Sequence, residues 1–200
     1  MNTEEQIQLD PEDIILLILE ANKNILGKDT FCGVTRLEKL LFLLQKETDF
    51  EGIDSFYHFS PHNFGPFSKE VYEALEFLES CDLISVKERV YNSRYATVGE
   101  LLLLQEISEQ DVSEDATNED LAATEKLFFL TGNGNKVAEK LQEAINNRRP
   151  NDIKNLYGII SRYGILPLNQ LIRYVYKKYP QMVVKSIHPE AQRIKIDNNQ

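Results

Sequence analysis

Two histidines provide the spacing in this chain that comes closest to a metal site. His58 and His62 are separated by three residues, which would place both imidazoles on one face of a helix. Pro61 lies between them, and the run Ser55–Ser60 is short and aromatic, as is typical of a small strand. His188 has no evident partner in the sequence. We therefore assign no catalytic or metal-binding role to any of the three histidines.

A glycine pair at Gly132-Asn133-Gly134 has the composition of a phosphate-binding loop but not its spacing. A P-loop needs the full pattern ending in Lys-Ser or Lys-Thr after a buried strand. These glycines instead favour a tight entry from a strand into a helix. No Ser-His-Asp or Cys-His signature is present. The sequence predicts a protein without catalytic residues or cofactor, unless folding gathers His58, His62 and distant carboxylates around a pocket.

Glutamates recur every three residues along one side of a predicted helix after Ser68, and this spacing is typical of a solvated face. A recognition helix in the major groove of DNA would present Arg, Lys, Asn or Gln to bases and phosphates. Glutamates there repel phosphate, whereas DNA binding depends on neutralised charge. We therefore expect this helix to bind a protein partner. The residues predicted for that contact are Lys69, Glu70, Glu73 and Glu76.

The net charge of −10 is divided unevenly along the chain. Residues 1–130 hold 10 Lys and Arg against 27 Asp and Glu, a net −17, whereas residues 131–200 hold 12 against 5, a net +7. Two segments of opposite charge either dock against each other, dock across a homodimer, or leave the basic one to meet a polyanion. We favour docking, because it lowers self-repulsion in each segment.

Basic and aromatic residues alternate in the C-terminal segment, a combination that also suits nucleic-acid contact. Arg173 and Lys177 are one helical turn apart on the same face. The candidates for DNA contact are Arg148, Arg149, Arg173, Lys177 and Lys178. The interpretation that we favour makes the tyrosines the half-buried seam of a helical hairpin and the cations its solvated side. DNA binding by this segment is the alternative function.

The elements that must position these residues begin with two helices. The first starts at Asp10, with Pro11 at its first helical position, and ends near Gly27. The second opens at Thr35, with Glu38 three residues later to form a capping box. Its leucine-rich sequence predicts a central helix that is covered on most sides.

A third helix and a β-hairpin are expected next. A rigid turn over Asn63–Phe67 leads to Ser68, the predicted N-cap of the third helix. The inward face of this helix is predicted to comprise Val71, Leu75, Leu78 and Cys81. Val86–Tyr91 and Lys126–Leu130 are the predicted strands of a wing. An acidic insertion at about 99–124 separates them and is expected to be largely a loop.

The remaining segments are predicted to be helical. Thr131 is the expected N-cap of a helix over Lys136–Ile145. Its predicted inward residues are Val137, Leu141, Ala144 and Ile145. A helical hairpin then covers residues 152–163 and 168–179, with Pro167 opening its second helix.

The predicted fold is mainly α with a small β wing. It comprises a winged helix-turn-helix domain over residues 1–147, followed by a basic, tyrosine-rich helical hairpin and tail over 148–200. Cys32 and Cys81 lie on apolar segments without metal-like spacing and are expected to be buried thiols in a reducing compartment. The sequence shows no signal peptide and no apolar run long enough to span a bilayer. These features predict a cytoplasmic protein.

Three motifs together resemble the SocA-type antitoxin (Panacea) domain and its YwgA-like relatives. They are Thr35-Arg-Leu-Glu-Lys-Leu-Leu-Phe-Leu-Leu, Asn63-Phe-Gly-Pro-Phe-Ser-Lys-Glu-Val-Tyr and Leu83-Ile, within roughly Asp10–Leu141. The strongest is the turn Phe64-Gly65-Pro66, in which phenylalanine replaces the tyrosine of the family. The resemblance implies a winged-helix-like fold without catalytic residues, in proteins that neutralise toxins or act as adaptors through protein contacts. It implies no functional residue for this chain.

Overall fold

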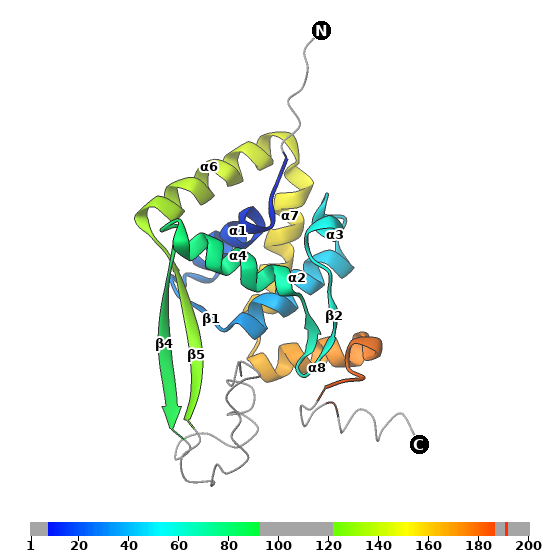
Figure 1. Ribbon diagram of the computed structural model, residues 1–200. Helices are drawn as coiled ribbons and strands as arrows, with labels where there is room; N and C mark the ends of the chain where they lie inside the picture. The colour runs from blue at the N-terminus through cyan, green and yellow to red at the C-terminus, as the bar shows by residue number, and fades with distance from the viewer. Residues whose placement is uncertain (1–7, 93–121, 187–190, 192–200) are drawn as a thin grey trace.

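A computed structural model describes residues 8–92, 122–186 and 191 of the chain (Figure 1). The described part is mainly helical with a small antiparallel sheet, as predicted. The acidic insertion expected at 99–124 lies outside the described residues, except for its last three residues, which belong to a strand rather than a loop. No helix within the described ranges is both long and apolar enough to cross a membrane.

The elements follow one another along the chain with few long connections. The helices are α1 (Pro11–Leu26), α2 (Val34–Glu47), α3 (Ile53–Phe56), α4 (Lys69–Ser80), α6 (Gly132–Arg148), α7 (Pro150–Ile159) and α8 (Leu168–Lys178). The strands are β1 (Phe31–Cys32), β2 (Ser60–His62), β3 (Gly65–Phe67), β4 (Ile84–Asn92) and β5 (Ala122–Leu130). One sheet has the order β1-β5-β4, and β2 and β3 form a separate hairpin.

Helices α1 and α2 form the centre of the core. α1 begins after the N-cap Asp10, which shares a capping box with Asp13, and ends at Gly27 in the left-handed conformation (φ 65°). Every residue from Ile14 to Asn22 is buried, and so is every residue of α2 from Leu37 to Leu44. The predicted bounds of α1 and the central position of α2 are therefore confirmed.

The capping box predicted for α2 is wrong. Gly33 is the N-cap, no side chain caps the helix, and both Thr35 and Glu38 are buried. The pattern Thr-x-x-Glu stabilises a helix end that lies open to solvent, but the first turn of α2 is enclosed by other elements. The carboxylate of Glu38 therefore bonds to a different helix, as described below.

The segment between α2 and α4 also differs from the prediction. A single strand was expected over Ser55–Ser60, but the chain forms the short helix α3 and then the β2–β3 hairpin. Gly65 has φ 90°, and a Cβ at this position would lie 2.7 Å from Cε1 of Tyr176 in α8. Glycine is needed here both for the backbone conformation and for the close approach of α8.

A long β-ribbon follows α4. Strands β4 and β5 pair antiparallel from Ile84 opposite Leu130 to Asn92 opposite Ala122, and this β4–β5 ribbon extends away from the helices (Figure 1). The chain then enters α6 through Thr131, whose hydroxyl accepts a hydrogen bond from the Gly134 N–H at 3.0 Å. A Cβ at Gly134 would lie 1.9 Å from the Leu83 carbonyl oxygen, so the glycine permits the tight entry that the sequence predicted.

Two predicted buried faces are shifted. Helix α6 buries Ala138 and Ile145, whereas Val137 is 39% exposed and Ala144 is also exposed. Cys81, expected inside, is the exposed C-cap of α4, and Cys32 is half-buried. Both errors have the same origin, because helical periodicity gives the width of an apolar face but not which edge of it the neighbouring helix covers.

The two predicted C-terminal helices are present, but they run in different directions and do not pack side by side as the expected hairpin (Figure 1). α7 continues into a π-helical turn over Ile160–Gly164, and α8 follows with Pro167 as its N-cap. Both helices pack against α2 and contribute Ile153, Leu156, Leu171 and Ile172 to the same core cluster as α1 and α2. The core is thus continuous across the expected boundary at 147.

Candidate protein-interaction site on α4

Helix α4 has one buried and one exposed face. Its buried residues follow the helical spacing and pack towards α1, across which α4 lies (Figure 1). They are Val71, Ala74, Leu75 and Leu78. The exposed positions are Lys69, Glu73, Glu76, Phe77, Glu79 and Ser80. Three of the four residues predicted for partner contact, Lys69, Glu73 and Glu76, therefore lie together on the open side of the helix.

The start of α4 is fixed by a buried ion pair beneath it. Glu38 and Lys39 of α2 have side chains only 4% and 1% exposed, and Lys39 Nζ lies 3.3 Å from Glu38 Oε2. Glu38 accepts a hydrogen bond from the Ser68 N–H at 3.3 Å, and Lys39 donates to the Pro66 carbonyl at 2.9 Å. Because a buried pair is costly to break, these bonds hold Ser68, the N-cap of α4, in place relative to α2.

Glu70, the fourth predicted contact residue, is bound within the chain. It accepts a hydrogen bond from the Ser68 hydroxyl at 2.5 Å and lies 3.0 Å from Nδ1 of His58. Partial burial raises the pKa of Glu70, but the hydrogen bonds from Ser68 and His58 outweigh it, so the pKa is lowered overall. Glu70 therefore supports the start of α4 rather than its open face. The sequence reasoning had placed it on that face.

The same three side chains do not form a nucleophilic triad. In a Ser-His-Asp triad the imidazole lies between the hydroxyl and the carboxylate, so that it can take the hydroxyl proton. Here the Glu70 carboxylate lies between Ser68 and His58. His62 packs its ring against Phe67, with ring centroids 4.7 Å apart. Across residues 8–92 and 122–186, no three His, Cys, Asp or Glu side chains gather to hold a metal ion.

The open face of α4 has an aromatic residue among its carboxylates. Phe77 is 54% exposed, and Glu73, one helical turn earlier, is the carboxylate next to it on the helix surface, while Glu76 and Glu79 are exposed on other sides of the helix. Lys69 forms an ion pair with Glu73. We name the four residues Glu73, Glu76, Phe77 and Glu79 the α4 acidic face. Exposed aromatic residues are enriched at protein interfaces, whose margins are polar.

The sequence predicts that Phe77 flanks the buried face of this helix, but the structure leaves it exposed. The buried positions 71, 74, 75 and 78 follow helical spacing, and position 77 falls outside that series. A large apolar residue that is out of phase with the core is a candidate for partner contact.

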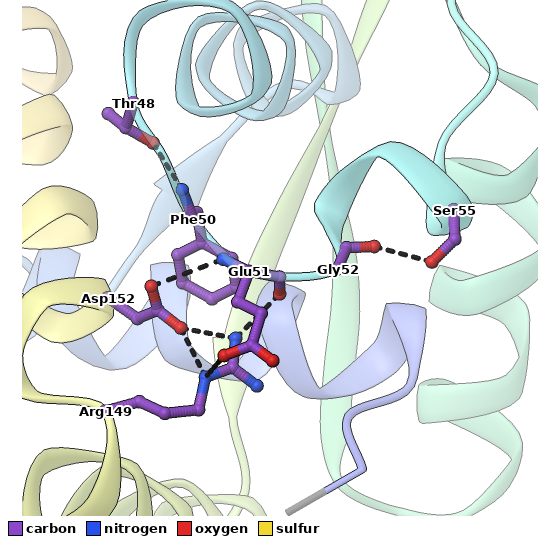
Figure 2. A network of polar contacts seen from close by, with 7 residues as sticks. All are labelled: Thr48, Phe50, Glu51, Gly52, Ser55, Arg149 and Asp152. Carbon is purple, nitrogen blue, oxygen red and sulfur yellow. Dashed lines mark hydrogen bonds and ion pairs between the residues drawn. The ribbon is translucent and has the colours of Figure 1, made fainter.

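Arg149 is one of the cations proposed for DNA, and Figure 2 shows it enclosed by partners from within the chain. Its side chain is 16% exposed, and Nε donates to Asp152 Oδ2 at 2.6 Å. The guanidinium also donates to the Glu51 carbonyl at 2.6 Å and lies over the Phe50 ring. Arg149 thereby ties the junction of α6 and α7 to the loop after α2 and is not directed at a polyanion.

Lys178, a second of these cations, belongs to a cluster around Glu47. The Glu47 side chain is 8% exposed and accepts hydrogen bonds from the hydroxyls of Tyr163 at 2.6 Å and Tyr174 at 2.8 Å, and from Lys178 Nζ at 2.9 Å. We name these residues, with Tyr179 at 3.3 Å, the Glu47 cluster. Burial and the Glu47 carboxylate raise the pKa of Tyr163 far above its ordinary value. Three of the C-terminal tyrosines thus contact Glu47 of α2 rather than forming a seam between the two C-terminal helices.

The other three candidates for DNA contact, Arg148, Arg173 and Lys177, are exposed. The ion pairs Glu47–Lys178 and Glu51–Arg149 join the acidic part of the chain to its basic part, as expected for two oppositely charged segments that dock.

Comparison with known proteins gives no match for this chain, either among protein-family models or among curated proteins.

Proposed function

We propose that this chain is a non-catalytic winged-helix interaction module, antitoxin-like or regulatory, that binds a protein partner through the α4 acidic face. In this proposal α2 and α4 are the two helices of the helix-turn-helix, with α3 and the β2–β3 hairpin inserted between them. The β4–β5 ribbon is the wing, and β1 completes its sheet by pairing with β5. This order supports the winged-helix assignment.

The observation that carries the proposal is the exposed aromatic ring of Phe77 on a helix whose other exposed residues include Glu73, Glu76 and Glu79. The position that would face DNA in a winged helix is acidic, which opposes contact with phosphates. A protein segment that carries Lys or Arg together with an apolar side chain complements this face in both charge and polarity. The buried Glu38–Lys39 ion pair and the hydrogen bond from the Ser68 N–H to Glu38 hold α4, and with it this face, in one orientation.

The proposal is tested by recovery of the partner from native cells with a tagged chain, measured by quantitative mass spectrometry. We expect Glu73→Lys/Glu76→Lys to lose a protein that the unaltered chain recovers, because both attraction and rim complementarity are reversed. The matched control is Asp29→Lys/Glu143→Lys, which makes the same change in net charge at exposed positions on other elements. This control should retain the partner. Equal recovery by both double variants would contradict the proposal.

DNA binding, the alternative function, is tested with the unaltered chain, the α4 double variant and a further double variant in α8. If the chain instead binds duplex DNA, binding should weaken steeply with salt and should be lost in Arg173→Glu/Lys177→Glu. The α4 variant should then bind DNA as well as the unaltered chain does, or better.

A further inference from the structure

Glu20 is a carboxyl group enclosed between helices without a full set of partners. It lies in α1, is 5% exposed, and its Oε2 is the buried side-chain oxygen or nitrogen that lacks a hydrogen-bond partner within the described residues. A buried polar atom without a partner is costly, and an ionised one costs more than a neutral one. Helices α6 and α7 both pack against α1.

The groups that face Glu20 do not neutralise its charge. From α6, Glu139 brings a second negative charge. From α7, Tyr157 faces it with a neutral phenol. On α1 itself, Asn24 forms a hydrogen bond with the carboxyl group one turn away, and Lys23 is the nearby cation. Lys23 is 43% exposed and donates instead to Asn135 at 2.9 Å, so its attraction is screened by solvent.

The hydrogen bonds around Glu20 connect the three helices. Asn24 of α1 also bonds to the Tyr157 hydroxyl of α7, which receives a second bond from Gln142 of α6. A change in the charge of Glu20 therefore affects the packing at the junction of α1, α6 and α7.

We propose that Glu20 is a proton-controlled switch at the junction of α1, α6 and α7: the junction is tightly packed while Glu20 is neutral and loosens when Glu20 ionises. This inference does not depend on the proposed function. Burial, followed by the charge of Glu139, raises the pKa of Glu20 from 4.5 to about 7. Because the folded-state pKa is the higher one, the stabilisation is complete below pH 4.5 and is lost as the pH rises through about 7.

The test is urea unfolding of the full chain between about pH 5.5 and pH 8.5, followed by circular dichroism. From the two pKa values, the Glu20 contribution to the folded-to-unfolded ratio should fall roughly thirtyfold over this range. Glu20→Gln keeps the shape of the side chain but cannot ionise, so its profile should lack this fall. The difference between the two profiles removes the contribution of every titratable group that the two proteins share.

Two variants on α6 provide controls. Glu139→Gln removes the facing charge but keeps Glu20, so the fall should remain and its midpoint should move to lower pH. Glu143→Gln, at an exposed position on the same helix, should reproduce the unaltered profile. Parallel profiles for the unaltered chain and Glu20→Gln would overturn the proposal.

Two direct measurements keep the proposal falsifiable if Glu20→Gln does not fold. In carboxyl-labelled protein, the ¹³C signal of Glu20 should titrate near pH 7, and titration near its ordinary value would overturn the proposal. Hydrogen exchange of the unaltered chain, corrected for the intrinsic effect of pH, should show α6 amides losing protection above pH 7 before those of α2. Equal protection of α6 on both sides of pH 7 would also overturn it.

Discussion

On α4, the carboxylates of Glu73, Glu76 and Glu79 lie on the open side of the helix, whereas Glu47 at the end of α2 is enclosed by three tyrosine hydroxyls and a lysine. Each of these four carboxylates contributes equally to the net charge of the acidic part of the chain. Only Glu47 uses its charge to hold the fold together. The comparison shows that the charge of a segment does not tell which of its charges remain available to a partner.

The cations of the C-terminal helices illustrate the same point. Lys177 and Lys178 are neighbours in α8, but Lys178 bonds to Glu47. Arg149 is likewise held by Asp152 and Glu51. The sequence groups all three in one candidate surface, because their charge and spacing do not show which of them is paired within the fold.

The largest expected effect concerns Glu47. Glu47→Ala should lower the free energy of unfolding by about 3 kcal/mol, because it leaves Lys178 and three hydroxyls without their common acceptor. Glu76→Ala, on the α4 acidic face, should change it by less than about 0.5 kcal/mol. Urea denaturation of both variants at neutral pH measures the difference. Similar losses for the two variants would remove the distinction between the Glu47 cluster and the α4 acidic face.

A smaller loss is expected at Arg149. Arg149→Ala should cost about 2 kcal/mol, because the nearly buried Asp152 carboxylate loses its cation and the Glu51 carbonyl loses a donor. Lys154→Ala, at an exposed position of α7, is the control and should cost less than about 0.5 kcal/mol. Thermal unfolding followed by circular dichroism would show this as a clear drop in Tm for Arg149→Ala alone. An unchanged Tm for that variant would mean that Arg149 remains available for an external partner.

The neighbouring lysines of α8 provide a finer comparison. Lys178→Gln should lower stability by less than about 1 kcal/mol, because its side chain is 47% exposed and solvent weakens the pair with Glu47. Lys177→Gln should have no measurable effect on stability. The effect of Lys178→Gln should disappear when Glu47 is already replaced, which a double-mutant cycle measures. Independent effects would place Lys178 on the solvated surface.

The smallest expected change is in the stability of the α4 variant. Glu73→Lys/Glu76→Lys should alter the free energy of unfolding by no more than about 0.5 kcal/mol, since both side chains are exposed. The comparison of unfolding curves with partner recovery then separates binding from folding. A marked loss of stability would show that these carboxylates also serve the fold, in the manner of Glu47.

Elements set by local sequence were predicted well. Asp10, Pro11 and Gly27 give the bounds of α1 because capping and backbone preferences act within a few residues. The same local logic failed at Thr35 and Glu38, where burial against α4 changed the role of the carboxylate. A local sequence pattern describes a helix end that is exposed to solvent. It does not show whether another element of the fold covers that end.

The sequence predicts the type of candidate site and the helix that carries it, but not all of the residues that form it. The spacing of the glutamates identified α4 and three of its exposed residues. Glu70 was misplaced because its partner His58 lies outside the helix, and Phe77 was expected to flank the buried face, whereas it is exposed. The partners of Arg149 include Glu51, 98 residues earlier in the chain, a separation that periodicity cannot bridge.

The contact between Gly65 and Tyr176 has a consequence for the order of events during synthesis. β3, which leads into α4, is seated against α8, an element made much later by the ribosome. Contacts of such long sequence separation form late, because the intervening chain must first be closed into a loop. Strand β3, which leads into α4, can therefore pack against Tyr176 only after α8 has folded. A partner that recognises α4 in its finished position would distinguish completed chains from nascent ones.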